Sequence, residues 1–106
     1  MRGDRKKRIA EQLQQIAAEF FAKKASRSAL LTVTRADISR DFKNATIYFT
    51  VLPESKEKAA LAFALRHGSE FRDYAKKQLN IKSIPFFHFE IDKGRKNFYK
   101  VAEELS

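Results

Sequence analysis

The sequence predicts an α+β fold, a two-layer sandwich in which helices cover one face of a three-stranded sheet. Apolar residues recur every three or four positions in two long stretches, which is the period of an amphipathic helix. They alternate with polar residues in shorter stretches, which is the period of a half-buried strand. A chain of 106 residues, 43% of them hydrophobic, can bury one core, so we expect a single domain over residues 1–106.

The first helix is expected over residues 9–21 and the turns that flank them. Its apolar residues fall on one side: Ile9, Leu13, Ile16, Ala17 and Phe20. Asp4 is a candidate N-cap, because a carboxylate accepts hydrogen bonds from the free N–H groups of a first turn. The helix is therefore amphipathic.

Two strands follow this helix. Residues 31–38 are rich in threonine and β-branched side chains, and residues 45–52 alternate strictly between two faces. Turn-forming residues occupy positions 39–44 between them, and Pro53 ends the second stretch. The pair is therefore predicted to form an antiparallel hairpin.

A kinked pair of helices is expected next. Ser55 is a candidate cap, and apolar positions at helical spacing run from Leu61 to Leu79. Gly68 interrupts this pattern, and glycine costs about 1 kcal/mol against alanine inside a helix. We therefore predict two helices that meet at a kink around residues 67–69.

The third strand is expected over residues 86–91, directly after Pro85. The long helical crossover before it permits a parallel pairing with the hairpin. Residues 97–105 have the pattern of a short terminal helix. The predicted order is helix, strand, strand, helix, kink, helix, strand, helix.

The charge of the chain is concentrated in two regions. Residues 1–27 hold eight basic and three acidic side chains, residues 66–82 hold five and two, and the formal net charge is +9. A localised excess of this size predicts a polyanionic partner, and nucleic acid is favoured over a membrane because the neighbouring apolar residues are needed for the core. The candidate RNA-binding residues are Arg5, Lys6, Lys7, Arg8, Lys23, Lys24, Arg27, Arg66, His67, Gly68, Ser69, Arg72, Lys76, Lys77 and Lys82.

No residue pattern indicates catalysis or a bound cofactor. The chain has no cysteine, and its two histidines fall on different predicted elements without metal-ligand spacing. Ser39 precedes Asp41 in a predicted turn, where such residues bond to the backbone, and no base for a catalytic serine is identifiable. No apolar run approaches the roughly 18 residues that span a bilayer. We expect a cytoplasmic binding protein without a metal, cofactor or small-molecule substrate.

Three polar or aromatic residues fall on the side of the sheet away from the core: Tyr48, Phe86 and His88. If that face is open, their rings are suited to stacking on bases, as in other sheet-based RNA binders. Otherwise they pack on their neighbours. His67 has the same two interpretations, an RNA contact at the kink or a partly exposed residue at a helix end.

The predicted order is that of a type II K-homology domain, and the sequence resembles one family with that fold, ribosome-binding factor A. The similar segments span roughly residues 5–95. They include Arg8–Ala10, Leu31–Arg35, Ser39–Asp41, Ala45, Ile47, Tyr48, Phe71, Arg72, Ile84–Phe89 and Asp92. At the kink the family has alanine, any residue and glycine, where this chain has His67, Gly68 and Ser69.

The resemblance implies a non-enzymatic factor that binds the immature small ribosomal subunit during late maturation of its rRNA, often in connection with growth in the cold. The factor is expected to be monomeric when free. A permanent ribosomal protein or a general single-stranded RNA binder is an alternative of the same class. A small RNA-processing enzyme is the alternative from another class.

Overall fold

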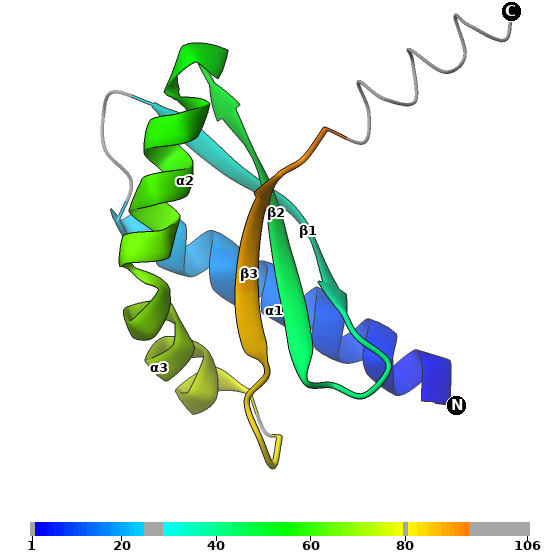
Figure 1. Ribbon diagram of the computed structural model, residues 1–106. Helices are drawn as coiled ribbons and strands as arrows, with labels where there is room; N and C mark the ends of the chain where they lie inside the picture. Colours follow the sequence, from blue (N-terminus) through cyan, green and yellow to red (C-terminus); the bar gives the residue numbers. More distant parts are fainter. Residues whose placement is uncertain (1, 25–28, 80, 94–106) are drawn as a thin grey trace, which may run out of the picture.

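The computed structural model describes residues 2–24, 29–79 and 81–93, with side chains from residue 5 onward. The elements are α1 (Arg2–Lys24), β1 (Leu30–Ile38), β2 (Asn44–Leu52), a short 3-10 helix η1 (Glu54–Lys56), α2 (Glu57–Arg66), α3 (Gly68–Gln78) and β3 (Phe86–Ile91). The predicted order is confirmed as far as the third strand (Figure 1). The predicted terminal helix, residues 97–105, lies outside the described residues.

The sheet has the order β1-β2-β3. β1 and β2 pair antiparallel, with Ala36 opposite Ile47. β3 pairs parallel to β2, with Phe89 opposite the same Ile47. The parallel pair exists because α2 and α3 carry the chain back to the end of the sheet where β2 began. The predicted hairpin and the parallel pairing are both confirmed.

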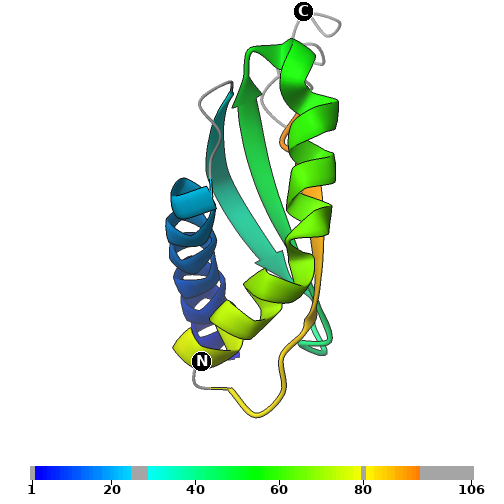
Figure 2. The same ribbon diagram turned by 90° about the vertical axis from the view of Figure 1, so that its left-hand side faces the viewer.

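Helices α1, α2 and α3 pack against one face of the sheet (Figure 2). On β2 the side chains of Ala45, Ile47, Phe49 and Val51 are buried, while the residues between them are partly or fully exposed. This alternation is what a strand with one buried face requires. Within the described residues, no helix covers the opposite face.

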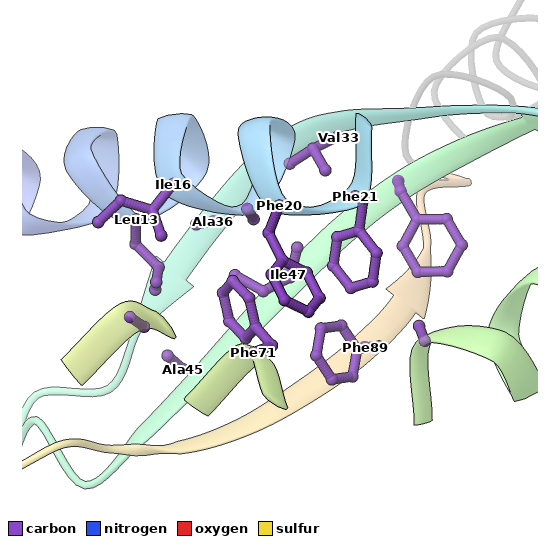
Figure 3. Close-up of a cluster of buried hydrophobic side chains, with 14 of the residues drawn as sticks. Leu13, Ile16, Phe20, Phe21, Val33, Ala36, Ala45, Ile47, Phe71 and Phe89 are labelled. Carbon is purple, nitrogen blue, oxygen red and sulfur yellow. The ribbon is translucent and has the colours of Figure 1, made fainter. Parts of the chain in front are cut away.

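An aromatic cluster fills the space between the helices and the sheet (Figure 3). Phe71 of α3 is fully buried, and its ring centroid lies 5.4 Å from Phe20, 5.8 Å from Phe21 and 5.8 Å from Phe89. Separations of this size allow edge-to-face and offset packing between rings. Phe71 therefore joins α1, α3 and β3 in one core.

A bulge interrupts β1 between Val33 and Arg35. The carbonyl of Thr34, the extra residue, accepts a hydrogen bond from Nε2 of Gln14 on α1 at 3.0 Å. Oγ1 of Thr34 donates to Oδ2 of Asp92 at 2.6 Å, just beyond the end of β3. One residue thus connects the first helix, the first strand and the end of the last strand.

The hairpin turn uses its polar side chains locally. Oγ of Ser39 donates to Oδ1 of Asp41 at 2.6 Å, and the N–H of Lys43 donates to the same oxygen at 3.0 Å. The Ser39 hydroxyl, and then the Lys43 N–H, lower the pKa of the Asp41 carboxyl by stabilising its charged form. Ser39 is a turn residue, as predicted.

Both predicted caps are wrong. α1 begins at Arg2, so Asp4 lies inside the helix and not before it. Ser55 lies inside η1, whose N-cap is Pro53, and no side chain caps α2. The N–H of Lys56 bonds to the carbonyl of Pro53 at 3.0 Å, so a backbone turn starts this segment where a side-chain cap was expected.

Candidate nucleic-acid interface

The N-terminal cluster consists of Arg5, Lys6, Lys7 and Arg8 in the first turns of α1. Three of these side chains are exposed and Lys6 is partly buried. The guanidinium carbon of Arg5 lies 5.6 Å from the ring centroid of Phe42 in the hairpin turn. Cations at a helix N-terminus face the positive end of the macrodipole, so this position does not stabilise the helix. Within the described part of the chain, none of the four forms an ion pair with a carboxylate.

Lys23 and Lys24 lie at the other end of α1. At 1.5 Å per residue, the helix separates Arg5 from Lys23 by about 27 Å. Nζ of Lys24 lies 2.8 Å from Oε2 of Glu70 on α3, and Nζ of Lys23 lies 5.6 Å from the ring centroid of Tyr74. The six described candidate cations of α1 therefore do not form one patch. Arg27 lies outside the described residues.

A groove of about 330 Å³ runs between the end of α1 and α3. It is lined by Phe20, Lys23, Lys24, Glu70, Asp73, Tyr74 and Lys77. Lys77 of α3 thus lines the same groove as Lys23 and Lys24 of α1, although it is far from them in the sequence. The two acidic side chains in the same groove offset part of this positive charge.

Glu70 connects two candidate residues. Its Oε2 pairs with Lys24 at 2.8 Å, and its Oε1 accepts a hydrogen bond from Nδ1 of His67 at 3.0 Å. The bond from Lys24 first, and then that from His67, lowers the pKa of the Glu70 carboxyl. The His67 ring also lies 4.6 Å from that of Phe63, so His67 is held by two neighbours on the helix pair.

Because its pKa is lower in the folded than in the unfolded state, Glu70 contributes stability that is fully present above its unfolded pKa. We expect this contribution to disappear as the pH falls through the lowered folded value. The Glu70→Gln variant should therefore lose less stability than the parent chain between neutral and acidic pH. Urea titrations across this range measure the difference, with Glu90→Gln as the control for removal of an exposed glutamate. Equal acid sensitivity of the parent and Glu70→Gln would contradict this role.

The kink between α2 and α3 is confirmed, but the residue with non-helical backbone angles is His67 and not Gly68. His67 has φ −96° and ψ 12°, and it ends α2 through a bond from its N–H to the carbonyl of Phe63 at 3.1 Å. Gly68 is the first residue of α3 and has a negative φ. A Cβ at this position would lie 3.9 Å from Cε2 of Phe89, an ordinary contact. The bend therefore does not depend on glycine.

Replacing Gly68 with alanine is accordingly expected to stabilise the protein by about 0.4 to 1 kcal/mol, because alanine restricts the unfolded chain and fits the folded one. RNA binding should be unchanged. Urea unfolding and an RNA-binding titration of the same variant test both statements. A destabilised variant would mean that the backbone at Gly68 needs the freedom of glycine.

Arg72 of α3 points toward the start of β3. Its Nη1 donates to the carbonyl of Pro85 at 3.0 Å, and its guanidinium carbon lies 5.6 Å from the ring centroid of Phe86. The remaining candidates are exposed or partly exposed and lie at the end of α2, along α3 and in the loop that follows it: Arg66, Ser69, Lys76, Lys77 and Lys82. The lysines in the last turn of α3 suit the helix dipole, which is a sufficient structural reason for them.

The structure adds two cations that were not among the predicted site residues. The guanidinium carbon of Arg35 lies 4.0 Å from the ring centroid of Tyr48 on the open face of the sheet. The carbonyl of Lys43 accepts the N–H of Phe86 at 2.9 Å, which places the hairpin turn beside Phe86. Both contacts depend on strand register, which can be assigned only once the pairing partners are known.

Other kinds of site find little support in the described residues. These residues contain no group of three or more histidine and acidic side chains that could hold a metal ion. None of their buried side-chain nitrogen or oxygen atoms lacks a hydrogen-bond partner. No helix among them has the length and apolar character needed to cross a membrane.

The comparisons with known proteins agree with one another. The family ribosome-binding factor A matches residues 5–105. The ribosome-binding factor A of Thermobifida fusca is 31% identical over 105 residues, which cover 96% of this chain and 70% of that protein. The crystal structure of ribosome-binding factor A from Thermus thermophilus superposes with a TM-score of 0.73 at 22% identity, covering 81% of this chain and 94% of that one. A homology model of the Thermus thermophilus factor has been fitted into an electron cryo-microscopy map of a 30S complex. It superposes with a TM-score of 0.69 at 21% identity, covering 78% of this chain and 90% of that one. The structural similarity confirms the K-homology-like fold.

Proposed function

Because the chain belongs to the ribosome-binding factor A family, we propose that it binds the immature small ribosomal subunit and assists the late maturation of its rRNA. It acts by binding alone: it holds an rRNA intermediate in place and makes or breaks no covalent bond. The related factor fitted into a map of a 30S complex supports the small subunit as the partner.

The observation that carries this proposal is the N-terminal cluster. Its four cations project from a helix that gains no stability from them, and most of them are exposed. Each phosphate neutralised by such a cation releases counterions, which supplies affinity without base-specific contacts. The cluster is therefore the principal rRNA contact. The residues at the end of α1, where Lys23 lies about 27 Å from Arg5 along the helix, and the residues around the kink form a second contact.

We place this activity in the cytoplasm, with a factor that is monomeric when free and needs no cofactor. The absence of cysteine suits a reducing compartment. The family resemblance supports a particular need for the factor during growth in the cold.

Sedimentation through a sucrose gradient tests the proposal. The factor is expected to co-sediment with precursor small subunits and to be largely absent from mature translating ribosomes. A protein found equally in both fractions would be a permanent ribosomal component, and one found in neither would not bind the small subunit at all. A growth deficit on deletion that is larger at low temperature is the expected cellular result.

A further inference from the structure

The open face of the sheet carries an aromatic side chain that the core does not use. Phe86, at the start of β3, is 68% exposed. It lies on the face opposite the helices, because the alternate residues Phe87 and Phe89 point into the core. Most of its apolar surface is therefore available for burial against a partner.

The position of Phe86 is fixed by neighbouring elements. Its N–H bonds to the carbonyl of Lys43 at 2.9 Å, and Asn44 of β2 is its register partner. Arg72 is held to the carbonyl of Pro85 at 3.0 Å, which keeps its guanidinium 5.6 Å from the Phe86 ring. A partner that binds to the Phe86 ring would therefore also contact the Arg72 guanidinium.

Hydrogen-bonding groups flank the ring on the same face. His88 is two residues further along β3. At the rise of a strand, its Cα lies about 6.6 Å from that of Phe86. Its Nε2 lies 3.0 Å from Oδ1 of Asn44, and both side chains are at least partly exposed. Together they present donors and acceptors next to an apolar ring, which suits the edge of a nucleobase.

The charges around Phe86 favour an anionic partner. The cation that lies beside its ring is Arg72 of α3. The acidic residues lie at and beyond the other end of β3, with Glu90 opposite Tyr48 in the register and Asp92, just past the strand, bonded to Thr34. An apolar ring beside a cation is an arrangement that binds single-stranded nucleic acid, because a base stacks on the ring while a phosphate pairs with the cation.

We propose that an unpaired nucleotide of rRNA stacks its base on Phe86, with its phosphate beside Arg72 and its base edge toward His88 and Asn44. This site deepens the proposed function and rests on it for the identity of the RNA. It is distinct from the N-terminal cluster, which neutralises phosphates without regard to base pairing. The protein thus contacts rRNA in two chemically different ways.

A tryptophan at this position would report stacking directly, because the chain contains no tryptophan. Fluorescence of the full-length Phe86→Trp protein is expected to be quenched on addition of a short oligouridine and not on addition of an RNA duplex. The matched control is Leu52→Trp, at an exposed leucine near the far end of the sheet, which should respond to neither. Equal responses of both variants to oligouridine would overturn the proposal.

Affinity provides a second measurement. The Phe86→Leu variant keeps an apolar side chain but lacks a ring, so it should bind oligouridine about tenfold more weakly than the parent, while Phe86→Tyr should bind like the parent. Duplex binding should not change. Unchanged oligouridine affinity in Phe86→Leu would overturn the proposal. A loss confined to subunit binding would also overturn it, since it would show that this surface meets a ribosomal protein. A parent chain that binds no precursor subunits, while Phe86→Trp still shows the quench, would contradict the proposed function and leave the stacking site standing.

Discussion

Replacing Phe71 with alanine is expected to lower the free energy of unfolding by about 3 to 5 kcal/mol. The side chain is fully buried and packs against rings of α1 and β3, so its removal leaves a cavity where the two layers meet. A domain of this size is stabilised by only about 5 to 15 kcal/mol in total. The variant should therefore be partly unfolded near physiological temperature. Urea titration measures the loss as a shift in midpoint at unchanged slope.

Phe86→Ala is the matched control for this change, because it removes the same atoms from an exposed position. It should alter stability by no more than about 0.5 kcal/mol. A loss below about 1 kcal/mol in Phe71→Ala, or equal losses in the two variants, would show that Phe71 does not hold the layers together.

Changing Arg5, Lys6, Lys7 and Arg8 together to glutamine should weaken binding to precursor small subunits by about 100- to 1000-fold at moderate ionic strength. The logarithmic salt dependence should become shallower by about three to four units, since each cation removed leaves one phosphate with its counterions. Stability should be unchanged or slightly higher, because four cations leave the positive end of the α1 dipole. Binding measured at several salt concentrations, together with a thermal melt, separates these effects.

The control removes positive charge from a part of the surface outside the candidate sites. Lys56 and Lys58 are exposed in η1 and α2, and their double glutamine variant should bind nearly as tightly as the parent. If the double variant loses as much affinity per charge as the quadruple variant, binding follows net charge alone. If the quadruple variant binds like the parent, the N-terminal cluster confers solubility and contacts no rRNA.

Periodicity made most of the fold predictable. The alternation in residues 45–52 placed Ile47 and Phe49 in the core, and the helical spacing around Phe20 did the same for α1. Helix starts were predicted less well, because a cap depends on where the backbone turns and not only on the residue type. Asp4 and Ser55 are good caps by type, yet both lie inside helical turns.

The candidate site was predictable in its residue types and less so in its arrangement. The cations at the two ends of α1 are close in the sequence, but a rigid helix separates them. The pairing of Lys24 with Glu70 joins residues far apart in the chain and depends on how α1 packs against α3. Likewise, the contact of Arg72 with Pro85 arises only when α3 and β3 are assembled. Such contacts are consequences of tertiary packing, which local patterns do not contain.

The bulge in β1 also affects how two copies of the protein can meet. β1 is an edge strand, and a regular edge offers a row of unpaired N–H and C=O groups to which a second chain can add. The extra residue, Thr34, breaks that row in the middle of the strand, and its carbonyl is already bonded to Gln14. The exposed charges of Arg35 and Asp37 follow directly. This edge is therefore a poor template for strand addition, which disfavours self-association of the protein by β-pairing.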